Sequence, residues 1–168
     1  MENDNNPSDR PVLKLKLTKF DVVLEVLAFL LLVTMWGYVL FHWSSLPEKI
    51  PVRIVNAEPK IFAPKVAAFI IPVAAIVVQF LLFAACRLIT LGNYIVKITP
   101  KNAERQYRLA TRFMRVFAVL CHVSFWRIVI ITCTTGKLDF ATTGLTMVLW
   151  CITVGAFVFY VVRTFTLK

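Results

Sequence analysis

Residues 66–86 read VAAFIIPVAAIVVQFLLFAAC, and this stretch decides the fold class. It contains no Asp, Glu, Lys, Arg or His. A helix needs about 20 predominantly apolar residues to cross the hydrocarbon core of a bilayer. Three further apolar runs of similar length lie at 26–43, 116–133 and 144–162. The sequence therefore predicts an all-α, polytopic membrane protein with four transmembrane helices.

The composition agrees with this prediction. Of the 168 residues, 59% are hydrophobic, and the mean hydropathy is +0.76. A soluble helical bundle is the weaker alternative, because the apolar runs lack the polar face that a surface helix needs. We expect a disordered or interfacial tail (1–19) and one membrane domain (20–168). The expected parts of that domain are spans at about 21–43, 66–89, 113–133 and 142–162, an outer loop at 44–65 and a basic inner loop and helix at 90–112.

The distribution of Lys and Arg predicts the orientation. The tail, the inner loop with its flanks and the C-terminus carry 13 of these residues, and the two outer segments carry 5. Basic segments stay in the cytoplasm, so both termini are expected inside. The net charge of +10 is explained by this asymmetry and by attraction to anionic lipid headgroups. It does not indicate nucleic-acid binding.

The inner loop predicts a basic helix that continues into the third span. Thr99 is expected as its N-cap, with Pro100 at the first helical position. Glu104 and Arg108 have the spacing of an i,i+4 ion pair. Five cations recur at helical spacing and form the inner basic stripe, which consists of Lys101, Arg105, Arg108, Arg112 and Arg115. Two interpretations stay open, namely binding of an acidic cytosolic protein and contact with anionic lipid alone.

Few polar side chains fall inside the predicted spans. Glu25 would be costly in a membrane without a partner, and we expect Arg115, at the same depth, to pair with it. Gln79 is expected to hydrogen-bond to a neighbouring helix, and Pro72 to kink the second span. His122 is interpreted as a packed, neutral side chain, and Arg127 as one that extends toward the outer surface.

The outer loop is rich in proline, which rules out a continuous helix. Residues 50–55 could form a short strand. The loop contains the candidate outer binding residues, which are Leu46, Pro47, Ile50, Pro51, Arg53, Asn56, Glu58, Pro59 and Lys65.

Two segments resemble one family of small bacterial membrane proteins. The first is LPEKIP at 46–51, followed by Glu58-Pro59, by Lys65 and by Pro72 in the next span. The second is ITPKNAERQY at 98–107. In this order they resemble the SdpI-type toxin-immunity and signalling proteins over roughly residues 20–115. Arg53 stands where the family usually has His, and Ala57 stands where Gly is usual. The resemblance implies a multi-pass protein of the bacterial inner membrane that binds a peptide or protein outside or a regulator inside.

Three functions remain as alternatives. The first is an immunity-like or signalling protein that uses the outer loop and the basic helix. The second is a small transporter or channel subunit, for which Glu25, Gln79, His122 and Arg127 would have to line a path. The third is a membrane scaffold without a ligand. No enzyme activity, cofactor or metal is predicted, and a homo-oligomer stays open.

Overall fold

The computed structural model of the chain describes residues 10–55, 58–134 and 140–167. In this part of the chain lie four α-helices, which are α1 (Lys19–His42), α2 (Ile70–Arg87), α3 (Ala103–Cys133) and α4 (Phe140–Thr166). The 3-10 helix η2 (Lys65–Phe69) extends α2 at its start. α1, α3, α4 and the combined η2–α2 segment are each long and apolar enough to cross a membrane. The prediction of four membrane-length helices is confirmed to that extent.

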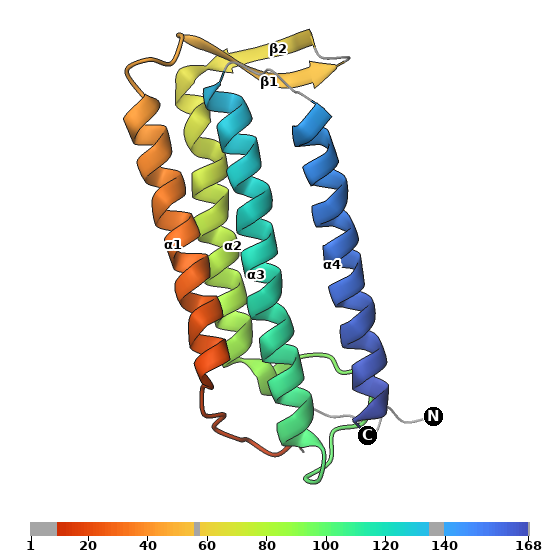
Figure 1. Ribbon diagram of the computed structural model, residues 1–168. Helices are drawn as coiled ribbons and strands as arrows, with labels where there is room; N and C mark the ends of the chain where they lie inside the picture. Colours follow the sequence, from red (N-terminus) through yellow and green to blue (C-terminus); the bar gives the residue numbers. More distant parts are fainter. Residues whose placement is uncertain (1–9, 56–57, 135–139, 168) are drawn as a thin grey trace.

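The third helix lies at the centre of the arrangement. α3 packs against α1, α2 and α4, and α1 also contacts α2 (Figure 1). α1 begins, and α4 ends, at the end of the bundle where α3 begins, and we call this the basic end. The opposite end carries a β-hairpin and is called the hairpin end.

The hairpin joins α1 to η2 and consists of β1 (Lys49–Val55) and β2 (Glu58–Pro64). The strands are antiparallel, with Ile50 opposite Ala63 and Lys49 opposite Pro64. The register becomes irregular around Arg53. Prolines fit such a short, irregular sheet because they cannot donate to a regular ladder. The strand expected at 50–55 is confirmed, whereas β2 was not predicted, so the chain is not purely α-helical.

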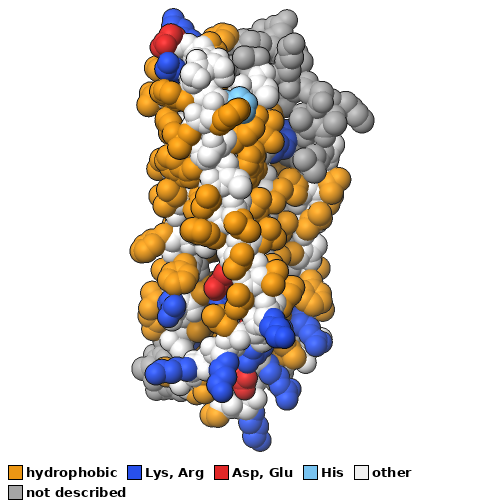
Figure 2. Space-filling model, turned by 60° about the vertical axis from the view of Figure 1, so that its left-hand side comes forward, with side chains coloured by type: hydrophobic (Ala, Val, Ile, Leu, Met, Phe, Trp, Pro, Cys, Tyr) orange, Lys and Arg blue, Asp and Glu red, His pale blue; other side chains and the backbone are white. Residues whose placement is uncertain are grey.

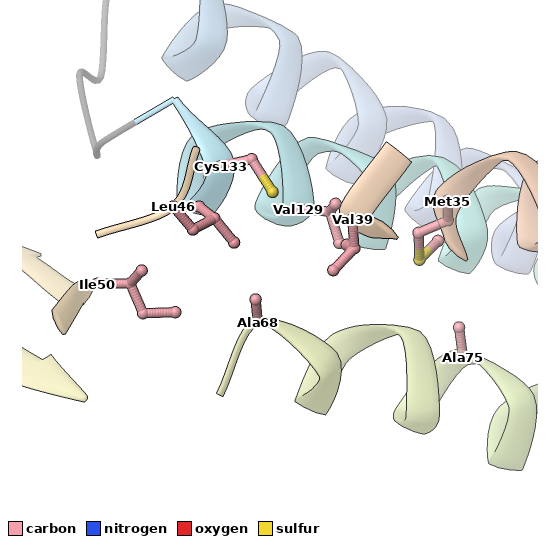
Figure 3. Close-up of a cluster of buried hydrophobic side chains, with 8 residues drawn as sticks. All are labelled: Met35, Val39, Leu46, Ile50, Ala68, Ala75, Val129 and Cys133. Carbon is pink, nitrogen blue, oxygen red and sulfur yellow. The ribbon is translucent and has the colours of Figure 1, made fainter. Parts of the chain in front are cut away.

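A buried apolar cluster connects the hairpin to three helices (Figure 3). Ile50 of β1 is fully buried and points toward Ala68, at the start of the second span. Small side chains on that span let the helices approach one another closely. The cluster consists of Met35, Val39, Leu46, Ile50, Ala68, Ala75, Val129 and Cys133. It fixes the base of the hairpin on the bundle.

A second buried cluster lies at the basic end. It consists of Ile89, Ile98, Ala103, Tyr107 and Ala110. The cluster joins the segment after α2, including the 3-10 helix η3 (Ile89–Leu91), to the first turns of α3. Leu15, in the extended segment before α1, packs against it. The basic end is therefore a folded part of the protein.

Two local predictions need correction. α3 begins at Ala103, so Thr99 is not its N-cap and Pro100 is not its first residue. The Asn102 side chain explains this, since it accepts a hydrogen bond from the Thr99 N–H (2.8 Å) and donates one to the Lys97 carbonyl (3.0 Å), which holds a turn before the helix. Pro72 lies in the first turn of α2, where a missing N–H breaks no bond of that helix. The second span is instead interrupted just before Pro72, where the 3-10 helix η2 changes to the α-helix α2.

The sides of the bundle are apolar. Large side chains such as Phe41, Phe80, Trp150 and Phe159 are each more than 60% exposed. Figure 2 shows hydrophobic side chains around the middle of the molecule and Lys and Arg concentrated at one end. Such an extended apolar surface suits hydrocarbon better than water.

Candidate functional site

Ion pairs between α1 and α3 organise the basic end. Arg115 Nε donates to Glu25 Oε1 at 2.8 Å, which confirms the predicted pair. Arg112 Nε donates to Asp21 Oδ1 at 3.3 Å, and Arg115 Nη1 lies 3.8 Å from the same oxygen. Two residues of the inner basic stripe therefore have intramolecular partners and hold α1 against α3.

The start of α1 positions these acids. Thr18 is the N-cap, and its hydroxyl accepts a hydrogen bond from the Asp21 N–H at 3.3 Å. Asp21 Oδ2 accepts one from the Thr18 backbone N–H at 2.9 Å, which completes a capping box. Asp21 is buried, and its other oxygen, Oδ1, faces Arg112 and Arg115 of α3. Asp21 also lies in the first turn of α1, where a negative charge interacts favourably with the helix dipole.

The rest of the inner basic stripe is divided. Arg108 Nη2 donates to Glu104 Oε1 at 2.9 Å, as predicted. Lys101 and Arg105 are exposed, and within the described residues their side chains have no hydrogen-bond or ion-pair partner. The same holds for Arg163, near the end of α4. From the sequence, Arg163 contributed only to the count of basic residues that predicts the orientation.

A groove with a volume of about 500 Å³ runs between α3 and α4 at the basic end. Arg105, Arg108, Arg112 and Arg163 lie along one part of it, and Phe20 of α1 contributes to its lining. The rest of the wall is apolar and includes Leu109, Phe113, Val116, Ala156, Phe159 and Tyr160. The groove therefore combines cations with a long hydrocarbon surface.

Gln106 fixes the end of α4 beside this groove. Its amide Nε2 donates to the carbonyls of Thr164 (2.9 Å) and Leu167 (3.3 Å). The last carbonyls of a helix have no intrahelical donor, so this side chain supplies the missing hydrogen bonds. Phe113 and Tyr160 stack at a centroid distance of 4.6 Å and add a second contact between the helices.

Arg10 connects the N-terminal segment to the loop after α2. Its guanidinium is buried and donates to the carbonyls of Thr90 and Gly92. It also lies over the ring of Tyr94, 5.3 Å from the centroid. Tyr94 donates to the Ile89 carbonyl at 2.7 Å, and burial raises the pKa of its phenol above the ordinary value. From the sequence, Arg10 contributed only to the count of basic residues that predicts the orientation.

At the hairpin end, several candidate binding residues have structural contacts. Leu46 and Ile50 are buried in the apolar cluster. Lys65 Nζ lies 3.1 Å from Glu48 Oε1, and it sits 5.0 Å from the ring centroid of Trp43. The Lys65 backbone N–H also donates to the Glu48 carbonyl. Of the candidate binding residues, Leu46 and Ile50 therefore anchor the hairpin, and Lys65 closes its base.

The other candidates at this end are placed less fully. Pro47 is exposed. Four candidates lie on the strands, with Pro51 opposite Phe62 and Arg53 opposite Ile61 on β1, and with Glu58 and Pro59 on β2. Asn56 and Ala57 lie outside the described residues. So does Lys137, one of the five basic residues counted in the two outer segments.

One exposed aromatic residue on the hairpin was not predicted from the sequence. Phe62 of β2 is 53% exposed, whereas its neighbour Ala63, opposite buried Ile50, is half-buried. Because successive side chains of a strand point to opposite faces, Phe62 lies on the face away from the bundle. This placement of Phe62 could have been inferred only if 58–64 had been recognised as a strand.

The polar residues of the spans are not joined into one set by their contacts. Glu25 pairs with Arg115 at the basic end. Gln79 Oε1 is buried without a hydrogen-bond partner among the described residues, so the predicted interhelical bond of that oxygen does not form. His122 is fully buried, and its Nδ1 lies 2.6 Å from the Ala118 carbonyl, in keeping with a packed side chain. Arg127 lines a different hollow between α3 and α4.

Metal-ligating groups do not converge in the part of the chain that the structure describes, since no three His, Cys, Asp or Glu side chains there are arranged to hold an ion. No protein-family model, curated protein or solved structure matches this chain. The resemblance to SdpI-type proteins therefore stays a prediction. The arrangement itself presents two candidate surfaces, the outer face of the hairpin and the arginine-lined groove.

Proposed function

We propose that this chain is a multi-pass membrane protein that binds a peptide ligand at its hairpin end, with its basic end in the cytoplasm. The apolar sides of the bundle support insertion. The excess of Lys and Arg at the basic end supports the orientation, with both chain ends inside. Together with the resemblance to SdpI-type proteins, this favours an immunity or signalling role in a bacterial inner membrane.

The observation that carries the proposal is the way the hairpin is presented. Its inner face is anchored by Ile50, and its base is closed by the Lys65–Glu48 pair. Its outer face carries the exposed aromatic ring of Phe62. Aromatic side chains on a rigid, partly polar surface are the usual centres of binding energy in protein interfaces. The hairpin is therefore suited to contact a ligand without unfolding the bundle.

The strand geometry favours an extended peptide as the ligand. The described sheet contains only β1 and β2, so each strand has one edge without a neighbouring strand in it. An exposed strand edge can add a further strand through backbone hydrogen bonds, and side-chain contacts then supply selectivity. Phe62 would provide such a contact on the outer face.

Peptide selection tests this proposal. The full chain, reconstituted in nanodiscs, is used to select binders from a phage-displayed library of linear peptides. The selected peptides are then measured against Phe62→Asp. Burial of one Phe side chain is worth about 1.5–3 kcal/mol, so their affinity is expected to fall roughly tenfold or more.

Ser44→Asp is the matched control, because Ser44 is exposed at the same end but precedes the hairpin. It adds the same charge and should leave binding unchanged. Peptides that bind wild type and Phe62→Asp equally, or a library that yields no binder, would contradict the proposed role of the hairpin.

The two alternatives have less support. A transporter needs a continuous polar path, whereas Glu25, Gln79, His122 and Arg127 have separate surroundings in the described structure. A scaffold without a ligand would leave the outward position of Phe62 unexplained.

A further inference from the structure

The groove between α3 and α4 has a gradient from charge to hydrocarbon along its length. Arg105 and Val116 both line it and are 11 positions apart on α3. At 1.5 Å per residue they are separated by about 16 Å along the helix axis. One leaflet of a bilayer contributes about 15 Å of hydrocarbon, half of the roughly 30 Å core. The groove thus has the length of one leaflet. Arg105 and Arg163 lie at the end where headgroups would lie, and Arg112, which is paired with Asp21, lies deeper.

The charge in the groove is only partly compensated by side chains in the part of the chain that the structure describes. Arg112 pairs with Asp21, and Arg108 pairs with Glu104. Arg105 and Arg163 face the groove from two helices and have no side-chain partner among the described residues. Guanidinium groups form strong, directional hydrogen bonds to phosphate oxygens. Arg105 and Arg163 therefore offer guanidinium groups to a phosphate from the two helices that form the groove.

The apolar wall identifies the kind of anion. A soluble phosphate would use the arginines but leave Phe113, Val116 and Phe159 uncovered. An acidic peptide could not extend into the apolar part, because its backbone would lose hydrogen bonds in hydrocarbon. An acyl chain has no such groups and covers apolar side chains directly. A lipid with an anionic headgroup satisfies both parts of the groove.

We propose that this groove binds one anionic phospholipid, with its phosphate on Arg105 and Arg163 and one acyl chain along the apolar wall of α3 and α4. The proposal rests on the membrane insertion proposed above and is independent of the ligand at the hairpin. The bound lipid would fasten α4 to α3, adding to the contacts that Gln106 and Tyr160 already make.

Native mass spectrometry of the full chain in a neutral detergent tests the proposal. Phosphatidylglycerol and phosphatidylcholine with identical acyl chains are titrated separately. Wild type is expected to bind one phosphatidylglycerol at a concentration at least about tenfold lower than phosphatidylcholine. Arg105→Gln combined with Arg163→Gln should weaken phosphatidylglycerol binding roughly 10- to 30-fold. Each cation near an anionic headgroup contributes a similar part of the binding free energy, so the loss of two cations gives a change of this size.

The control removes two charges at the same end outside the groove, through Lys14→Gln with Lys101→Gln. It should retain the preference for phosphatidylglycerol. A second variant, Ala156→Phe, keeps every charge but places a larger side chain in the apolar part of the groove. It should weaken phosphatidylglycerol binding several-fold. Resistance of each variant to alkaline extraction from membranes checks insertion separately, so a failure to insert is distinguishable from a failure to bind lipid.

Several outcomes would overturn the proposal. Equal binding of the two lipids to wild type would remove the role of the arginines, as would equal losses in the groove variant and its charge-matched control. Full competition by glycerol 3-phosphate, which has no acyl chain, would show a phosphate site without the lipid groove. An acidic peptide that displaces phosphatidylglycerol through Arg105 and Arg163 would identify a protein partner instead.

Discussion

Glu25 and Arg115 are the residues whose interaction can be tested most directly. The carboxylate is partly exposed, the guanidinium is 12% exposed, and their atoms are 2.8 Å apart. Removing one member of a shielded ion pair leaves the other charge poorly compensated. Arg115 also lies near Asp21, so it has two acidic neighbours, whereas Glu25 has one cationic partner among the described residues.

We therefore predict unequal losses of stability. Glu25→Gln should lower the free energy of unfolding by about 1–2 kcal/mol, and Arg115→Gln by about 2–3 kcal/mol. The double variant should lose less than the sum, with a coupling energy of about 1 kcal/mol or more. Unfolding of the four proteins in the same detergent measures this cycle, and strictly additive losses would contradict a direct pair.

This pair was predictable because two simple facts coincide. A lone carboxylate is costly inside a span, and hydropathy places Glu25 and Arg115 at similar depths. By contrast, the roles of Asn102 and Gln106 involve backbone carbonyls, and any sequence offers many of these. No periodicity connects Gln106 to Thr164, which lies 58 positions away. Such contacts follow only from the packing of the helices.

Among the elements, α4 has the attachment that is easiest to isolate. Gln106 supplies donors to carbonyls at the end of α4. In the stacked pair, Tyr160 lies about one turn deeper than Thr164, and Phe113 lies about two turns deeper than Gln106. Loss of the Gln106 amide should free the end of α4 while the bundle stays folded.

We predict that Gln106→Ala increases the accessibility of the end of α4. In a chain without its native cysteines, Thr166→Cys should react with a maleimide roughly 2- to 10-fold faster when Gln106 is replaced, which corresponds to the loss of about one hydrogen bond. Lys101→Ala is the matched control, since Lys101 is exposed at the same end and does not line the groove. An unchanged rate would show that Gln106 does not hold this helix end.

The hairpin shows how far an element can be predicted. The prolines of 44–65 exclude a long helix, and the apolar residues of β1 predict a strand, so half of the hairpin was expected. β2 contains Pro59 and Pro64 and lacks a plain alternating pattern. The pairing of β2 with β1 depends on the packing of Ile50 against three helices, and the local sequence does not specify that packing. The outward position of Phe62 was missed for the same reason.

At the scale of the whole molecule, hydropathy was sufficient to predict the four long helices. The order of packing was not predictable, because helices in lipid have no preferred apolar face. The central position of α3 follows from its ion pairs with α1, its contact with α2 and the Gln106 bonds to α4. The groove exists only once α4 is placed beside α3, so its lining could not be assembled from separate spans.

The central claim is that the bundle spans a membrane with the hairpin outside and the basic end in the cytoplasm. Single-cysteine labelling in intact cells tests it, after Cys86, Cys121, Cys133 and Cys151 have been replaced by Ala. With a membrane-impermeant maleimide, Pro47→Cys should be labelled in intact cells, and Lys101→Cys only after the membrane is opened, since both positions are exposed at opposite ends. The reverse pattern, or equal labelling of both in intact cells, would contradict the account.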